Sequence, residues 1–329
     1  MVSVEFFLPS PYYFLASMDI SVIIPTHNNA ATIEKAVRSV MEQSFTGEYE
    51  VCLALDNCTD NTVDVIKKLQ SEFPNIVYTE VDVRGDLRSR MAALSLSKGK
   101  YIMFLDGDDY YHKDALKVCY NKMEDTGADI LNFSLFYMTK KKTRPSKLGK
   151  NATYDRYKAV KAFFADISYR GFMATKVFKR ELLDKIGFSY SGKMMIYMDS
   201  LYNFLAICHC EKAVSINSPL YYYNKTNENA QTARGNKRIF DNLSVRANMR
   251  KYCEEKGDKR LLSLFRGNKF RIKLLMVVDF ALSSFSDKKE KRRIKKQAKK
   301  ELSLIYGKKE MPRDGYTYSK SLEEIGFNV

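Results

Sequence analysis

Four short apolar segments in the first third of the chain predict buried strands, at residues 20–24, 51–55, 76–81 and 101–105. The segments between them carry apolar residues at helical spacing, as at Ile33, Val37 and Val40. They predict helices at 33–41, 62–73 and 87–97. Strands that alternate with helices form right-handed βαβ units, so we expect an α/β fold with a mostly parallel, Rossmann-like sheet and flanking helices.

Three of the predicted strands end in polar turns, at residues 25–29, 56–61 and 106–109. On open α/β sheets, ligands bind beyond the carboxyl ends of the strands. We therefore expect these three turns to lie together and to form one binding crevice.

The pattern is less regular after residue 110. It predicts a helix at 113–122, a solvated loop at 140–145, helices at 156–165 and 180–186, and a strand at 213–223. From about 237 the sequence is helical and basic, with an apolar face at Ile272, Leu275, Met276 and Phe280. Residues 288–300 then read KKEKRRIKKQAKK.

These patterns divide the chain into three parts. Residues 1–17 are apolar and aromatic and form either an extension upstream of the true start or a small hydrophobic flap. Residues 18–230 form the α/β domain, and residues 231–329 form a basic, mostly helical C-terminal region.

Composition excludes a disordered or collagen-like chain, because 45% of the 329 residues are hydrophobic. The net charge of +16 is concentrated after residue 233. Residues 234–329 have 26 basic and 12 acidic side chains, whereas the preceding residues have 29 and 27. An anionic partner is therefore expected at the C-terminal region.

The preferred partner of the C-terminal region is an anionic membrane surface, since clustered Lys and Arg beside an apolar face bind acidic lipid. A solvated helix and a homo-oligomer contact are the alternatives, and nucleic acid ranks low because no recognised nucleic-acid module is present. No apolar run is long enough to span a bilayer. The six cysteines form no paired framework, so we expect a cytoplasmic protein, peripheral at the inner face of the plasma membrane.

An acidic cluster, Asp106, Asp108 and Asp109, directly follows the strand at 101–105. Three carboxylates within four residues repel one another unless a cation lies between them. Oxygen ligands of this kind suit Mg²⁺ or Mn²⁺. The alternative interpretation is an exposed acidic turn before the next helix.

Taken in order, three segments resemble the family-2 glycosyltransferases of GT-A fold, the bacterial enzymes that build surface polysaccharides and teichoic acid glycosides. The segments are SVIIPTHN (21–28), LDNCTDNT (55–62) and FLDGDD (104–109). The resemblance covers about residues 18–230. It departs from the family pattern at Leu55 and Met198, where other members often carry an acid.

The resemblance implies roles for the residues of the first two turns. Pro25, Thr26 and Asn28 would bind the nucleotide-sugar, with Pro25 and Thr26 lining the nucleobase pocket. Asp56 would accept the imide hydrogen of uracil, and Arg90 would contact the diphosphate.

It also implies that Asp106 holds the ribose or a metal-bound water and that Asp108 binds Mn²⁺ or Mg²⁺ directly. Asp109 and Lys176 are further candidates for contacts with donor or acceptor. Asp199, in IYMDSLYNF (196–204), matches the catalytic base of the family. A helix N-cap is the alternative role for Asp199.

The resemblance thus implies an inverting, metal-dependent hexosyl- or N-acetylhexosaminyl-transferase. Its donor would be a UDP-sugar, and its acceptor a hydroxyl of a cell-surface glycan or lipid-linked acceptor. A metal ion and Arg90 would neutralise the charge that builds on the leaving diphosphate. A carboxylate on the other side of the sugar would take the proton of the acceptor. The alternative is a non-catalytic nucleotide-sugar or glycan binding protein that retains the fold.

Overall fold

A computed structural model describes residues 18–146, 150–165, 169, 172–186, 197–226 and 239–265, together with 289, 292, 293 and 296. The chain divides into two compact units. Unit 1 comprises residues 1–156, 172–189 and 209–227, and unit 2 comprises 157–171, 190–208 and 228–329. The domain limits predicted above, with a boundary at 230, stay a prediction.

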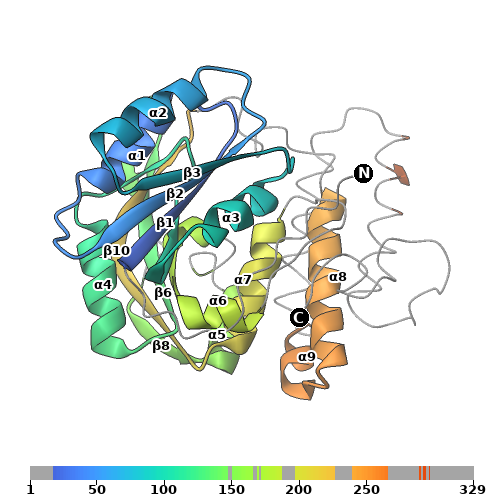
Figure 1. The fold of residues 1–329 in the computed structure, drawn as a ribbon. Helices are drawn as coiled ribbons and strands as arrows, with labels where there is room; N and C mark the ends of the chain where they lie inside the picture. Colours follow the sequence, from blue (N-terminus) through green and yellow to red (C-terminus); the bar gives the residue numbers. More distant parts are fainter. Residues whose placement is uncertain are drawn as a thin grey trace. The chain divides into compact units, whose positions relative to one another are not determined.

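Within the described residues, ten strands of unit 1 form one sheet (Figure 1). Eight of them follow the order β3-β2-β1-β4-β9-β6-β10-β5, while β7 pairs with β6 and β8 pairs with β10. The strands are β1 (Met18–Thr26), β2 (Tyr49–Asp56), β3 (Ile76–Val81), β4 (Gly99–Phe104), β5 (Tyr110–Tyr111), β6 (Ile130–Met138), β7 (Thr143–Pro145), β8 (Ala152–Asp155), β9 (Lys176–Lys179) and β10 (Lys212–Asn224).

The first four strands confirm the predicted parallel arrangement. β1 lies between β2 and β4, and β2 pairs with β3, all in parallel. The other half is mixed, because β9 runs antiparallel to both β4 and β6, whereas β6 and β10 are parallel. The prediction of a mostly parallel sheet is therefore right for β1–β4 and is corrected to a mixed sheet overall.

The solvated loop predicted at 140–145 is also corrected. Thr143–Pro145 form β7, which pairs antiparallel with the end of β6 and makes a hairpin. The basic residues gave no strand pattern, since the strand is only three residues long and fully exposed.

Of the helices described in unit 1, three alternate with its parallel strands, and two more follow the antiparallel strands β5 and β9. They are α1 (Ile33–Met41), α2 (Thr62–Glu72), α3 (Asp86–Ser95), α4 (Ala115–Thr126) and α6 (Arg180–Ile186). The predicted apolar face of α1 is confirmed, because Ile33, Ala36, Val37 and Val40 are all buried.

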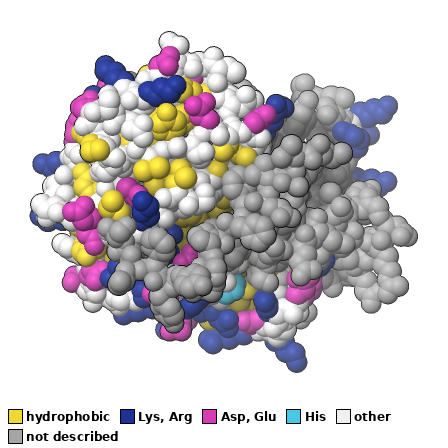
Figure 2. Space-filling model, viewed as in Figure 1, with side chains coloured by type: hydrophobic (Ala, Val, Ile, Leu, Met, Phe, Trp, Pro, Cys, Tyr) yellow, Lys and Arg dark blue, Asp and Glu magenta, His cyan; other side chains and the backbone are white. Residues whose placement is uncertain are grey.

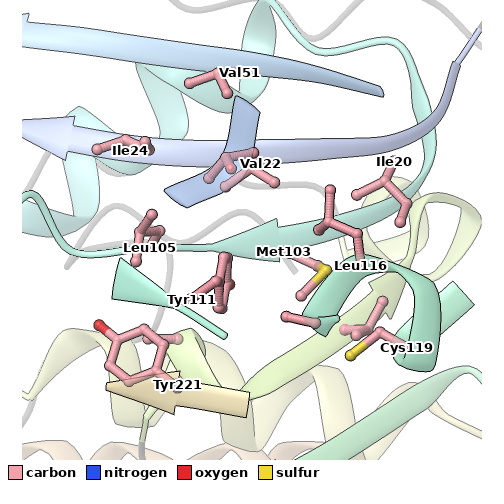
Figure 3. Close-up of a cluster of buried hydrophobic side chains, with 14 of the residues drawn as sticks. Ile20, Val22, Ile24, Val51, Met103, Leu105, Tyr111, Leu116, Cys119 and Tyr221 are labelled. Carbon is pink, nitrogen blue, oxygen red and sulfur yellow. The ribbon is translucent and has the colours of Figure 1, made fainter. Parts of the chain in front are cut away.

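The core of unit 1 forms between these helices and the sheet. Figure 3 shows Val22 and Ile24 of β1, Met103 of β4 and Leu116 of α4 drawn as sticks in one cluster. Tyr111 and Tyr221 belong to the same cluster and are almost fully buried. The core thus extends from the parallel strands to the end of β10.

Unit 2 contains α5 (Arg156–Ala165), α7 (Met198–His209), α8 (Ile239–Glu255) and α9 (Lys259–Phe265), of which α5 and α7 each have one terminal residue in unit 1. Its core is aromatic, because Phe204 of α7 contacts Phe163 and Phe164 of α5 and Phe265 of α9. α8 and α9 lie where helical sequence is expected. The apolar face at 272–280 lies outside the described residues, as does most of the basic segment 288–300. Among the described residues, no helix is long and apolar enough to cross a membrane.

Candidate active site

The three polar turns meet at one end of the sheet in unit 1, as the sequence predicts. They follow β1, β2 and β4, which are neighbours with their carboxyl ends at the same edge. The side chain of His27 contacts the carbonyl oxygen of Asp56, with Nδ1 at 2.6 Å. Thr32 Oγ1 donates to the carbonyl oxygen of Gly107 at 2.8 Å. The first turn is therefore bonded directly to the second, and the start of α1 just after it is bonded to the third.

The first turn is fixed by asparagine side chains. Asn28 adopts a left-handed backbone, with φ of 53°, a conformation that Asn tolerates better than most residues. Its Oδ1 accepts hydrogen bonds from the backbone N–H groups of Thr59 at 2.7 Å and Asp60 at 3.3 Å. The predicted nucleobase residues Pro25 and Thr26 are both buried at the end of β1.

Asp56 is buried and its carboxylate already holds four donors. Oδ1 accepts from the N–H groups of Val83 and Arg84, and Oδ2 accepts from the N–H of Gly85 and the hydroxyl of Ser89. These distances lie between 2.7 and 3.1 Å. A carboxylate offers about four acceptor positions, so none is left for a uracil imide unless a bond breaks. Asp56 thus fixes the loop at the start of α3, and its predicted contact with uracil stays a prediction.

Arg90 is carried by α3 and is buried at 5% exposure. Its Nη2 donates to Asp106 Oδ1 at 2.5 Å, and its Nε donates to Asp86 Oδ2 at 3.0 Å. Its Nη1 is buried and makes no hydrogen bond within the described residues. The structure thus brings together the predicted diphosphate residue Arg90 and the predicted ribose or metal residue Asp106.

The turn at 106–109 packs closely against the first turn. A Cβ atom on Gly107 would lie 3.0 Å from Asn29 Oδ1 and 3.1 Å from its Cγ, so a side chain there would press on the Asn29 amide. The N–H of Asp109 bonds to the carbonyl oxygen of Asp106 at 3.0 Å and closes the turn. Asp108 is half-buried, and its carbonyl oxygen accepts a hydrogen bond from Asn224 Nδ2.

Asp109 is the buried member of the acidic cluster, at 2% exposure. Its Oδ2 accepts from the Tyr221 hydroxyl at 2.5 Å, and its Oδ1 accepts from the N–H of Asn224 at 2.6 Å. Burial, followed by the charges of Asp106 and Asp108, raises the pKa of Asp109 to about 8 despite these two bonds. The carboxyl group is therefore mostly protonated at neutral pH, and it joins the turn to the end of β10.

The acidic cluster therefore offers few ligands for a cation. Among the described residues, no three His, Cys, Asp or Glu side chains are grouped to hold a metal ion. Asp109 is occupied by Tyr221 and Asn224, and Asp106 is paired with Arg90. Asp108, with Asp106 beside it, fits a cation that takes most of its ligands from water and substrate phosphates, as Mg²⁺ does.

Lys176 and Asp199 lie away from the three turns in the sequence. Lys176 begins β9 in unit 1, is fully buried, and donates through Nζ to the carbonyl oxygen of Phe172 at 3.0 Å. Asp199 lies in the first turn of α7 and belongs to unit 2. Its predicted roles as base or helix cap stay predictions.

Left-handed backbone conformations occur at or near several of the predicted site residues. Within the described residues, four non-glycine residues have left-handed φ angles: Asn28, Asn57, Arg84 and Tyr197. Each is a predicted site residue or lies within two positions of one, except Arg84, whose N–H binds Asp56. Strained residues of this kind concentrate at functional sites. Sequence reasoning missed Tyr221 as the partner of Asp109 and Ser89 as the partner of Asp56, because both contacts depend on the tertiary fold.

A family profile described as Glycosyl transferase family 2 matches residues 21–201, which include all three turns. The poly(ribitol-phosphate) β-glucosyltransferase of Bacillus spizizenii is 33% identical over 116 residues, which are 34% of this chain and 18% of that protein. The poly(ribitol-phosphate) β-N-acetylglucosaminyltransferase TarP of Staphylococcus aureus is 26% identical over 215 residues, 64% of this chain and 63% of that protein. The chain spans less than two thirds of the length of either relative.

Solved structures share the fold. The crystal structure of S. aureus TarS residues 1–349 in complex with UDP-GlcNAc matches 88% of this chain and 89% of that chain, with a TM-score of 0.62 and 18% identity. The mannosyltransferase PcManGT from Pyrobaculum calidifontis, in complex with GDP-Man and Mn²⁺, matches 91% and 90%, with a TM-score of 0.54 and 14% identity.

The bonds around Asp56 predict a loss of stability in Asp56→Asn. The amide cannot accept at both positions, so one pair of donors loses its acceptor, and the free energy of unfolding falls by about 1–3 kcal/mol. Urea unfolding measures the change. Asp82→Asn, at an exposed acid two residues before Arg84, is the control and should shift it by less than about 0.5 kcal/mol. Equal effects of the two substitutions would show that Asp56 does not hold the loop.

The raised pKa of Asp109 predicts a pH dependence of stability in EDTA. Between about pH 4 and pH 8 the folded protein keeps a proton that the unfolded chain has released, so the free energy of unfolding falls as pH rises through that window and the contribution levels off above it. The decline is at most about 1.4 kcal/mol per pH unit. Asp109→Asn stays neutral and should decline less steeply in urea unfolding across this range. The same slope in both proteins would contradict the assignment.

Proposed function

The chain belongs to glycosyl transferase family 2, and we propose that it transfers a sugar from a UDP-sugar, with inversion, to a hydroxyl of a cell-surface glycan or lipid-linked acceptor. One observation carries the proposal: the family match includes all three turns, which lie together at the carboxyl ends of β1, β2 and β4. Ligands of open α/β sheets bind at this edge.

The donor is proposed to be a UDP-sugar because TarS, which shares the fold, was crystallised with UDP-GlcNAc. Pro25, Thr26 and Asn28 of the first turn would lie along the nucleotide. Arg90 would act near the diphosphate, and its unpaired, buried Nη1 is the donor it has available. UDP-GlcNAc, UDP-Glc and UDP-Gal are all candidate donors, because they share the nucleotide and the diphosphate.

Mn²⁺ or Mg²⁺ is proposed as the cofactor, held by Asp108 with Asp106 beside it. A divalent cation there would supply positive charge to the leaving diphosphate. Asp106 is already oriented by its bond to Arg90, so the cation and the guanidinium would act on the same leaving group.

Asp199 is proposed as the catalytic base. The acceptor hydroxyl must lose its proton as it attacks the anomeric carbon, and a carboxylate is suited to take it. The left-handed backbone of Tyr197, two residues before it, is consistent with a constrained position at a site.

Removal of the proposed metal ligand should abolish metal-dependent donor binding. UDP should raise the melting temperature of the wild type more with Mn²⁺ than with EDTA, and Asp108→Ala should lose this difference, since the cation links protein and phosphate. Thermal shift measures it, and Asp125→Ala, at an exposed acid of α4, is the matched control. Equal stabilisation of the wild type with and without metal would exclude the metal role.

Asp199→Asn should separate catalysis from binding. The amide cannot accept the proton, so transfer should slow by about 10²–10⁴-fold, whereas affinity for the UDP-sugar should stay within a few-fold. The readouts are UDP release and donor titration. If Asp199 only caps α7, or if the chain is a non-catalytic binding protein, the variant should behave as the wild type, because Asn caps about as well as Asp.

The membrane proposal concerns the basic C-terminal region. Deletion of residues 287–329 should weaken binding to anionic liposomes at low salt and leave UDP binding intact, because it removes the most concentrated basic sequence. Liposome co-sedimentation measures the effect. A full-length protein that ignores anionic liposomes at low salt would exclude the membrane role and favour self-association through this region.

A further inference from the structure

The β6–β7 hairpin of unit 1 has an unusual charge distribution. Residues 130–154 contain six basic residues and no acidic residue. Four of the six lie at the hairpin: Lys140, Lys141, Lys142 and Arg144, all exposed. A second group of exposed basic residues, Lys289, Arg292, Arg293 and Lys296, lies in the C-terminal region, whereas over much of the face in Figure 2 basic and acidic side chains are interspersed. We refer to residues 139–145 as the basic hairpin.

The basic hairpin is an ordered structure. Thr139 N–H and Oγ1 both donate to the carbonyl oxygen of Lys142, at 3.1 and 2.9 Å, and the Lys142 N–H donates back to Thr139 Oγ1. Beyond the turn, Thr143–Pro145 pair with Phe136–Met138. The lysines are therefore carried by an ordered turn. Less conformational entropy of the backbone is lost when a ligand binds to such a turn.

The basic hairpin is joined to the candidate active site through β10. The N–H of Asn224, near the end of β10, donates to Asp109, and the next N–H, that of Lys225, donates to the carbonyl oxygen of Met138 at 3.0 Å. Met138 is the last residue of β6 before the turn. The hairpin and the turn that carries Asp108 thus flank the same strand end.

Aromatic rings lie between these cations. Arg144 is directly opposite Tyr137, and Tyr137 is directly opposite Tyr223, so the three side chains share one face of the sheet. Lys225 Nζ lies 4.2 Å from the centroid of the Tyr137 ring. Phe172, which is 47% exposed, contacts Tyr223 with a centroid separation of 6.2 Å.

We propose that the basic hairpin, with Lys225 and the rings of Tyr137, Tyr223 and Phe172, binds the acceptor chain, and that this chain is a phosphodiester-linked polyol or glycan. The proposal rests on the proposed function, because it places the acceptor beside the transfer site. Successive exposed cations match a partner with repeated negative charges, and lysines bind phosphate as point charges from several directions. The rings offer apolar faces for the sugar or polyol units between the phosphates.

A bilayer fits the basic hairpin less well. Within residues 139–145 the only apolar residue is Pro145, so the hairpin itself has no long apolar side chain that would enter a lipid surface. Peripheral attachment by a short segment relies on apolar insertion as well as charge. A carboxylate polymer also fits less well, since planar carboxylates favour the bidentate fork of Arg, and the hairpin carries three Lys and one Arg.

The test measures binding of the full chain, without donor, to a fluorescent hexamer of glycerol phosphate by anisotropy at low and at moderate salt. Lys141→Glu/Lys142→Glu should weaken binding at low salt by about tenfold or more, because two attractive contacts become repulsive. Lys67→Glu/Lys68→Glu, a matched pair of adjacent exposed lysines on α2, should stay within about twofold. Lys141→Gln/Lys142→Gln should give an intermediate loss, and circular dichroism checks that every variant is folded.

Unchanged binding in the hairpin variant, or equal losses in both charge-reversed variants, would overturn the proposal. So would hairpin-dependent binding that is as tight for hyaluronate oligosaccharide or phosphatidylglycerol vesicles as for the phosphodiester chain. The assay contains no donor, so its outcome is independent of turnover. A wild type that binds the hexamer through the hairpin but never releases UDP from a UDP-sugar would refute the proposed function and leave this surface standing.

Discussion

Mutual repulsion among the three carboxylates after β4 is the constraint around which this site is built. Asp106, Asp108 and Asp109 fall within four residues at the end of a buried strand, where low polarity strengthens their repulsion. Each is accommodated differently. Asp106 is neutralised by Arg90, Asp109 takes up a proton and bonds to Tyr221, and Asp108 is half-buried, with its carbonyl oxygen bonded to Asn224.

Other contacts in unit 1 hold Arg90 and Tyr221 in place beside the acidic cluster. Arg90 reaches Asp106 only if α3 starts at the correct point, and the saturated carboxylate of Asp56 fixes that start through the N–H groups at 83–85. Tyr221 reaches Asp109 only because β10 pairs with β6 and β5. The mixed half of the sheet therefore supports the candidate site at the ends of the parallel half, and it also carries the basic hairpin near the same turn.

Much of the parallel half was predictable because strand and helix periods are local. The runs 20–24, 51–55, 76–81 and 101–105 all fall within strands or end one residue beyond, and the convergence of the three turns follows from parallel pairing alone. The acidic cluster and the family motifs each lie within a short segment, so they too are visible in the sequence. By contrast, Tyr221 and Asp109 are 112 residues apart, and no local pattern joins them.

The same reason applies at Asp56 and at the basic hairpin. The resemblance implies a nucleobase contact for Asp56, and its bonds to a loop 27 to 29 residues away could not be predicted from the local sequence. In the hairpin, the strand Thr143–Pro145 is defined only by its pairing with β6. The local sequence shows which hydrogen-bonding groups a segment carries, whereas the tertiary fold determines which of these groups are already bonded to other parts of the chain.

The central claim is that this chain transfers a sugar from a UDP-sugar with inversion, and proton NMR of the first product tests it most directly. The wild type would be incubated with Mg²⁺ and UDP-GlcNAc, UDP-Glc or UDP-Gal in turn, and the anomeric signal followed before mutarotation. With these α-linked donors, the account predicts release of UDP from at least one donor and a newly formed β-anomer, because a single base directs attack from the face opposite the diphosphate. An initial α-product, or no UDP release from any of the donors with water or glycan as acceptor, would contradict it.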